Sequence, residues 1–190
     1  MMPDQPGDNY KTNEEKAAEA ASKADRKSEA KGWIISIAAA VVIALTLRFF
    51  VFEFIRVEGP SMQPTLYTNE YVFMERVTYW FNSPKRGDIV ICMFPGSSQT
   101  YVKRVIGEPG DSIKIEDGVL YINDVPNYDY FGMPHDRDME ELIVPAGSVV
   151  VMGDNRNDST DSRDIGPIPF ERVLGKALFI IWPPGRIHGL

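Results

Sequence analysis

Residues 57–66 of the chain read Val-Glu-Gly-Pro-Ser-Met-Gln-Pro-Thr-Leu. We interpret the other motifs of the sequence in relation to this stretch. Ser61 lies between Pro60 and Pro64. Prolines fix φ and remove a backbone donor, which excludes regular helix or central strand on either side of the hydroxyl. A serine on such a stiff, irregular backbone indicates a positioned nucleophile, although a turn serine in a linker explains the same pattern.

A long apolar segment precedes this stretch. Residues 32–52 hold about 20 mainly apolar residues, enough at ~1.5 Å per residue to span the ~30 Å core of a bilayer, and Arg48 is their single charge. Residues 1–31 are polar and alanine-rich, so we predict a disordered tail or a frayed helix. Basic residues crowd its end, which predicts a cytoplasmic N-terminus, one transmembrane helix and an extracytoplasmic domain over residues 53–190. A cleavable secretory signal is the competing interpretation, but the apolar run is too long for one.

Residues 53–190 are predicted to form a mainly β domain. Asp117-Gly118 indicates a tight hairpin, and no long amphipathic helix pattern follows residue 70. We therefore expect a single antiparallel, barrel-like sheet. Short apolar or alternating runs, separated by turn residues, predict strands at 71–74, 88–93, 100–106, 112–115, 119–122, 148–152 and 173–182.

Composition excludes several classes of function. The net charge of -7 argues against nucleic-acid binding. Cys92 is the only cysteine, so no intrachain disulfide forms, and its apolar surroundings predict a buried core residue. His135 and His188 are the only histidines, which argues against a metal site, and we expect both to be exposed. We predict neither a metal nor a cofactor.

Lys103 is the best candidate for a base that would activate Ser61. Histidine is the usual partner of a serine nucleophile, but lysine serves when burial makes its amine neutral. Strand alternation places Tyr101, Lys103 and Val105 on one face, beside apolar neighbours. A solvated lysine on an edge strand is the alternative.

Residues 152–163 form a polar stretch dense in side chains that hydrogen-bond backbone, as a rigid irregular loop requires. A calcium loop starting at Asp154 is the obvious alternative. Its spacing fails, because Ser159 stands at the glycine position and Ile165 at the position of the bidentate glutamate.

Together these stretches resemble the ordered motifs of bacterial type I signal peptidases of the small, Gram-positive kind. The motifs are residues 59–66, 86–90, 101–111 and 153–163, and the resemblance extends over about residues 32–184. It implies that Ser61 is the nucleophile and that its backbone N–H helps bind the oxyanion. Lys103 would be the general base of a serine–lysine dyad.

The resemblance also implies roles for supporting residues. Ser159 would orient the lysine amine, and Asp161 and Arg163 would form a structural ion pair. Asp154 and Asn155 would support the turn, and Tyr101 would pack over the lysine stem. Gly59 stands where some members carry a serine that helps bind the oxyanion, and glycine removes that donor. The implied substrates are signal peptides of exported preproteins, with small residues one and three positions before the scissile bond.

Two other classes of function compete with this interpretation. A self-cleaving repressor of related fold would need a DNA-binding domain in place of residues 1–52, which offer none. An inactive anchored module would lack Ser61, Lys103 or Ser159, and all three are present. Separately, the aromatic residues 79–81 predict a contact with the membrane interface, for which core packing is the alternative.

Overall fold

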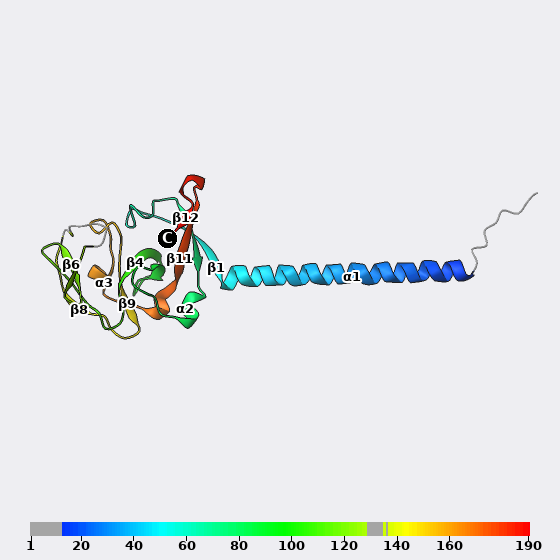
Figure 1. Cartoon of the computed structure of the whole chain (residues 1–190), viewed down its shortest axis with the longest axis horizontal. Coiled ribbons are helices and arrows are strands. Elements are labelled where there is room, and N and C mark those ends of the chain that lie inside the picture. Colours follow the sequence, from blue (N-terminus) through cyan, green and yellow to red (C-terminus); the bar gives the residue numbers. More distant parts are fainter. Residues whose placement is uncertain (1–12, 129–134, 136) are drawn as a thin grey trace, which may run out of the picture. The chain divides into compact units, whose positions relative to one another are not determined.

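The computed structural model describes residues 13–128, 135 and 137–190 (Figure 1). The chain divides into two compact units, Met1–Leu47 and Arg48–Leu190. The first is formed by the helix α1, whose bounds are Asn13–Phe50. Residues 13–31, for which a disordered tail or a frayed helix was predicted, belong to this helix. Their many alanines favour a helix, and Glu19 and Lys23 stand at the i, i+4 spacing that supports one.

The apolar part of α1 exposes large side chains, among them Trp33, Ile34 and Val42. A search of the described residues finds no helix whose length and apolar character would let it cross a membrane. The transmembrane helix predicted over residues 32–52 is thus not supported by the structure. The helix ends at Phe50, and a strand begins two residues later.

The second unit is mainly β, as predicted, with only short helical turns. The helices are α2 (Thr78–Phe81), α3 (Ser162–Ile165), η1 (Phe170–Arg172) and η2 (Pro184–Arg186). The strands are β1 (Phe52–Arg56), β2 (Tyr71–Glu75), β3 (Ile89–Met93), β4 (Thr100–Gly107), β5 (Ser112–Glu116), β6 (Val119–Ile122), β7 (Val125–Asn127), β8 (Met139–Ile143), β9 (Ser148–Met152), β10 (Ile168–Pro169), β11 (Val173–Trp182) and β12 (His188–Gly189).

The larger sheet has eight strands in the order β1-β2-β11-β3-β4-β9-β10, and β12 pairs with β11. Its strands pair antiparallel, and register shifts interrupt β11 and β4. Among the residues that the structure describes, strand β1 pairs only with β2. Strand β4 pairs with β3 along residues 100–104 but with β9 only from Arg104 onward, so the first half of β4 has one free edge.

The prediction of a single sheet is wrong, because a second sheet of four strands follows the order β7-β6-β5-β8. Figure 1 shows β6 and β8 apart from β1 and β11. The predicted hairpin forms between β5 and β6, where Asp117 and Gly118 adopt the positive φ that such a turn requires. Gly107 ends β4, and a Cβ there would lie 2.9 Å from Ile113 of the small sheet, so glycine allows the two sheets to approach closely at this point. Side chains of β5 and β6 pack in one hydrophobic cluster with side chains of β4 and β9.

Candidate active site

Ser61 lies in an irregular loop between β1 and β2, as its flanking prolines predict. A hydrogen bond from the Gln63 N–H to the Pro60 carbonyl oxygen (3.0 Å) closes the turn around the serine. Met62 and Leu66, which are 1% and 0% exposed, fix this loop in the hydrophobic core. The hydroxyl therefore sits on a backbone that has little freedom to move.

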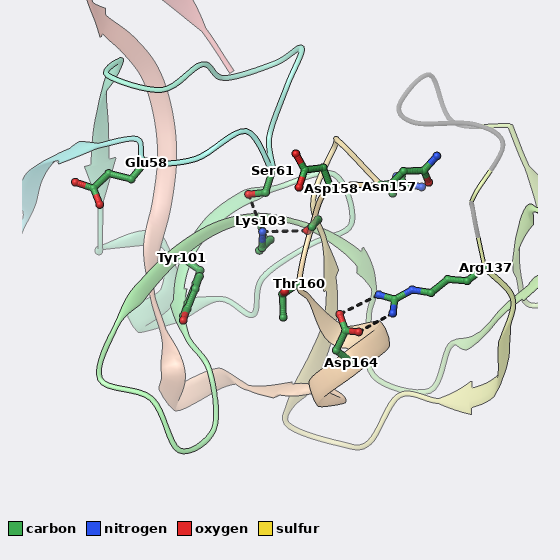
Figure 2. Close-up of a pocket in the computed structure, with 11 residues that line it drawn as sticks. Glu58, Ser61, Tyr101, Lys103, Arg137, Asn157, Asp158, Thr160 and Asp164 are labelled. Carbon is green, nitrogen blue, oxygen red and sulfur yellow. Dashed lines mark hydrogen bonds and ion pairs between the residues drawn. The ribbon is translucent and has the colours of Figure 1, made fainter.

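The Lys103 amine lies within hydrogen-bonding distance of this hydroxyl. Its Nζ donates to Ser61 Oγ at 2.8 Å and to Ser159 Oγ at 3.1 Å (Figure 2). Lys103 is 2% exposed, and Val105 on the same strand face is fully buried, so the alternative of a solvated lysine is wrong. The structure thus brings together three residues that lie far apart in the sequence.

The environment favours the neutral form of this amine. Burial lowers the pKa of Lys103 below its ordinary value, because desolvation penalises the charged form. The carboxylate of Asp161 opposes this shift, whereas the Arg163 guanidinium acts in the same direction as burial. Cys92 is buried, as predicted, and desolvation raises the pKa of its thiol to about 12.

A buried ion pair supports the serine that contacts Lys103. The hydroxyl of Ser159 donates to Asp161 Oδ2 at 2.7 Å, and the Gly153 N–H donates to the same oxygen at 3.0 Å. Arg163 donates from Nε to Asp161 Oδ1 at 2.8 Å, and both side chains are almost fully buried. Although burial alone would raise the pKa of Asp161, these hydrogen bonds hold it below its ordinary value.

The turn that carries Asp154 and Asn155 joins this loop to the serine loop. The Asn155 N–H donates to the Ser61 carbonyl oxygen at 3.0 Å. Asp154 accepts from Nε of Arg104 at 2.8 Å and from the hydroxyl of Thr65. The carboxylate of Asp154 therefore ties the serine loop to strand β4, which also carries Lys103.

Gly153 is the position where the two loops approach most closely. A Cβ there would lie 2.3 Å from Ser159 Oγ and 2.4 Å from the Ser61 carbonyl oxygen. Only glycine leaves room for this approach. The sequence places this glycine in a recognised motif, but its packing role follows from the structure.

Two cavities meet at Glu58, Ser61 and Tyr101. The strand-edge cavity, of about 360 Å³, lies between β1 and the free half of β4. The loop cavity, of about 490 Å³, extends to residues 157–160 (Figure 2). The ring of Tyr101 stacks on Phe94, with centroids 3.9 Å apart, and forms part of the wall of both cavities.

Sequence reasoning missed two polar residues near the site. Arg156 is 1% exposed and donates from Nε to the Gly153 carbonyl oxygen. His135, predicted to be exposed, is 5% exposed, and its Nε2 lies 3.1 Å from Arg156 Nη1. The residues next to His135 in the sequence do not indicate this burial, because its partner Arg156 comes from a distant loop. His188 is exposed, as predicted. Within the described part of the chain, no group of three His, Cys, Asp or Glu side chains could hold a metal ion.

A serine hydroxyl beside a buried amine, open to cavities on both sides, is the arrangement of a serine hydrolase. The family model described as "Signal peptidase, peptidase S26" matches residues 30–182. The chain belongs to this family of signal peptidases and is a serine peptidase.

Individual relatives agree with the family. Signal peptidase I of Leptolyngbya laminosa is 36% identical over 92% of this chain and 90% of its own length. Signal peptidase I of Bacillus licheniformis is 38% identical over 86% of this chain and 95% of its own length. The crystal structure of a signal peptidase I from Enterococcus faecalis V583 is 32% identical, covers 50% of this chain and 97% of that one, and has a TM-score of 0.46.

Proposed function

We propose that this chain removes N-terminal signal peptides from exported preproteins with a dyad of Ser61 and Lys103. The observation that carries the proposal is the contact of 2.8 Å between Ser61 Oγ and Lys103 Nζ. Lys103 is only 2% exposed, so its amine is desolvated. A neutral amine accepts a proton, whereas an ammonium does not, so burial turns this contact into a base beside a nucleophile.

The reaction begins when the neutral amine of Lys103 accepts the proton of the Ser61 hydroxyl. The oxygen attacks the scissile carbonyl, and the Ser61 backbone N–H donates to the oxyanion. Gly59 contributes no side-chain donor to this step. The Lys103 ammonium then protonates the leaving amine, the C–N bond breaks, and an acyl-enzyme forms. Water, deprotonated by the same lysine, releases the signal peptide and restores Ser61.

Ser159 holds the amine in place during both proton transfers. It donates its own proton to Asp161, so its oxygen is left to accept a hydrogen bond from Lys103 Nζ. This arrangement leaves the lone pair of the neutral amine free to face Ser61. We propose that Asp161 and Arg163 keep Ser159 in this orientation.

The substrate lies extended in the strand-edge cavity. Strand β1 and residues 100–103 of β4 each leave one backbone edge free, and both line this cavity next to Ser61. An extended peptide that adds to such an edge gains backbone hydrogen bonds, and alternate side chains enter the cavity wall. Small side chains one and three residues before the scissile bond fit this narrow space.

We further propose that the chain associates with a lipid bilayer. The exposed apolar side chains of α1 between Trp33 and Leu45 favour contact with lipid. In the second unit, Trp80 and Phe81 are 57% and 80% exposed, as a membrane-interface contact requires. Tyr79 differs, because its hydroxyl donates to Asp88 at 2.9 Å and its ring packs against the core.

Cleavage of a preprotein by the purified chain tests the dyad. Replacing Ser61 or Lys103 with alanine should lower kcat/KM by at least roughly 10³-fold, since either change removes a reacting group. Replacing Lys85, a lysine whose side chain is 66% exposed, with alanine is the matched control and should change little. Activity that survives either dyad substitution rejects the proposed mechanism.

A further inference from the structure

The loop cavity is where the residues after the scissile bond lie if the proposed function is correct, and the inference below rests on it. A substrate strand that fills the strand-edge cavity reaches Ser61 at its scissile bond. The chain beyond that bond continues into the loop cavity, because the two cavities meet at Ser61. The lining of the loop cavity therefore faces the N-terminus of the mature protein.

Most charges that line the loop cavity have a partner within the protein. Arg137 pairs with Asp164, with Nη1 2.7 Å from Oδ1 (Figure 2). The Arg156 guanidinium is buried and donates to the Gly153 carbonyl oxygen at 3.0 Å. Burial keeps the pKa of Lys103 below its ordinary value, which favours an uncharged amine.

Two carboxylates remain, and Figure 2 shows them on opposite sides of Ser61. Glu58 and Asp158 are both exposed, and among the described residues neither carboxylate has a hydrogen-bond or ion-pair partner. Glu58 belongs to both cavities, whereas Asp158 belongs to the loop cavity alone. Asp158 is therefore the carboxylate that only the residues after the scissile bond would meet.

The loop that carries Asp158 is fixed relative to the nucleophile. The Asp158 N–H donates to the Asn155 carbonyl oxygen at 3.0 Å, and the Asn155 N–H donates to the Ser61 carbonyl oxygen at 3.0 Å. The next residue, Ser159, contacts Lys103. The position of this carboxylate is thus set by the same hydrogen bonds that build the dyad.

We infer that Asp158 is a specificity-determining residue for the first two residues after the scissile bond. Its carboxylate favours a cationic side chain there and disfavours an acidic one. The charge acts in a solvent-open cavity, so the preference is graded and screened by salt.

Matched substrates test this inference. They are preprotein peptides that are identical except for Lys, Gln or Glu at the first or the second residue after the scissile bond. kcat/KM is measured with the full chain in detergent and with its Asp158→Asn and Asp158→Lys variants. Glu171→Gln is the matched control, because Glu171 is an exposed acid outside both cavities.

At one or both positions the unmodified chain should prefer Lys over Gln and Gln over Glu, each step by roughly 1.5- to 5-fold, which is the range for exposed charge pairs. Asp158→Asn should remove this order, Asp158→Lys should invert it, and Glu171→Gln should keep it. Cleavage of the Gln peptides should change less than cleavage of the Lys and Glu peptides. An order that persists in Asp158→Asn at both positions, or a uniform loss for all peptides, overturns the inference.

Failure of the proposed function is distinguishable from failure of this inference. If the unmodified chain cleaves none of the peptides, the proposed function is wrong. Binding of fluorescent versions of the same peptides to the Ser61→Ala variant, measured by anisotropy, still decides the inference. Tighter binding of Lys than of Glu peptides supports it, and equal binding overturns it.

Discussion

Replacing Gly153 with alanine should separate the groups of the dyad while adding only one methyl group. The new Cβ would lie 2.3 Å from Ser159 Oγ and 2.4 Å from the Ser61 carbonyl oxygen, whereas ordinary contact begins at 3.4 Å. At least one loop must therefore shift by roughly 1 Å. Lys103 contacts both loops, at 2.8 and 3.1 Å, so such a shift breaks one of its two hydrogen bonds. A misplacement of this size costs about 10²-fold in rate.

Gly107→Ala is a matched control for this substitution. Its Cβ would lie 2.9 Å from Ile113 Cγ1 and 3.0 Å from Val144 Cγ2, in the core of the small sheet and outside both active-site cavities. Overpacking of either kind costs about 1–3 kcal/mol of unfolding free energy, which is roughly 3–10 °C in Tm for a unit of this size. Both variants should unfold earlier in thermal scans, but at a temperature where both are folded only Gly153→Ala should lose cleavage activity. A Gly153→Ala enzyme within threefold of the unmodified kcat/KM refutes the close-approach explanation.

The remaining predictions concern the charge of Lys103 and contact with lipid. Cleavage should rise with pH as the amine loses its proton, and because the folded-state pKa of Lys103 is below 10.5, the unfolded chain binds more protons and stability should also rise with pH. Subtracting the unfolding free energy of Lys103→Met, over the pH range below the ordinary lysine value of 10.5, should isolate this slope. A difference that stays flat up to pH 10.5 contradicts it. The full chain should float with vesicles, a chain lacking residues 1–47 should float less, and Trp80→Ser with Phe81→Ser should reduce flotation further without lowering Tm. Equal flotation of all three rejects lipid contact.

The proposed dyad was predicted from the family resemblance of its ordered motifs, because the local sequence left an alternative open at both Ser61 and Lys103. Ser61 stands between prolines, and the alternation of β4 placed Lys103 on the face of Val105. Both signals are local, and neither excluded its alternative until the order of the motifs along the chain was considered. The loop of Ser159 was predicted as rigid and irregular because of its density of hydrogen-bonding side chains, and the structure confirms that it is held by Asp161.

The second sheet could not be predicted in the same way. Strands β5 and β6 were predicted, but the sequence did not show which sheet they join. That depends on the path of the chain after Gly107, at the end of β4, and no local pattern of residues indicates this path. Strands β7 and β8 are short, and their side chains are mostly exposed, so they lack a hydrophobic alternation. The burial of His135 depends on Arg156 in a distant loop. The helix over residues 13–31 reflects the helix propensity of its many alanines.

The buried pair of Asp161 and Arg163 helps to explain how the pKa of Lys103 is lowered although a carboxylate lies nearby. An unpaired Asp161 so close to the amine would favour the ammonium, and the two would form a salt bridge instead of an acid–base pair. The Arg163 guanidinium balances the negative charge of Asp161 and donates hydrogen bonds to both of its carboxylate oxygens. The Ser159 hydroxyl lies between Asp161 and the Lys103 amine. The carboxylate can then orient the serine without protonating the lysine. We therefore expect Arg163 to be needed for the proposed role of Lys103, even though it contacts neither Lys103 nor Ser61 in the hydrogen bonds that build the site.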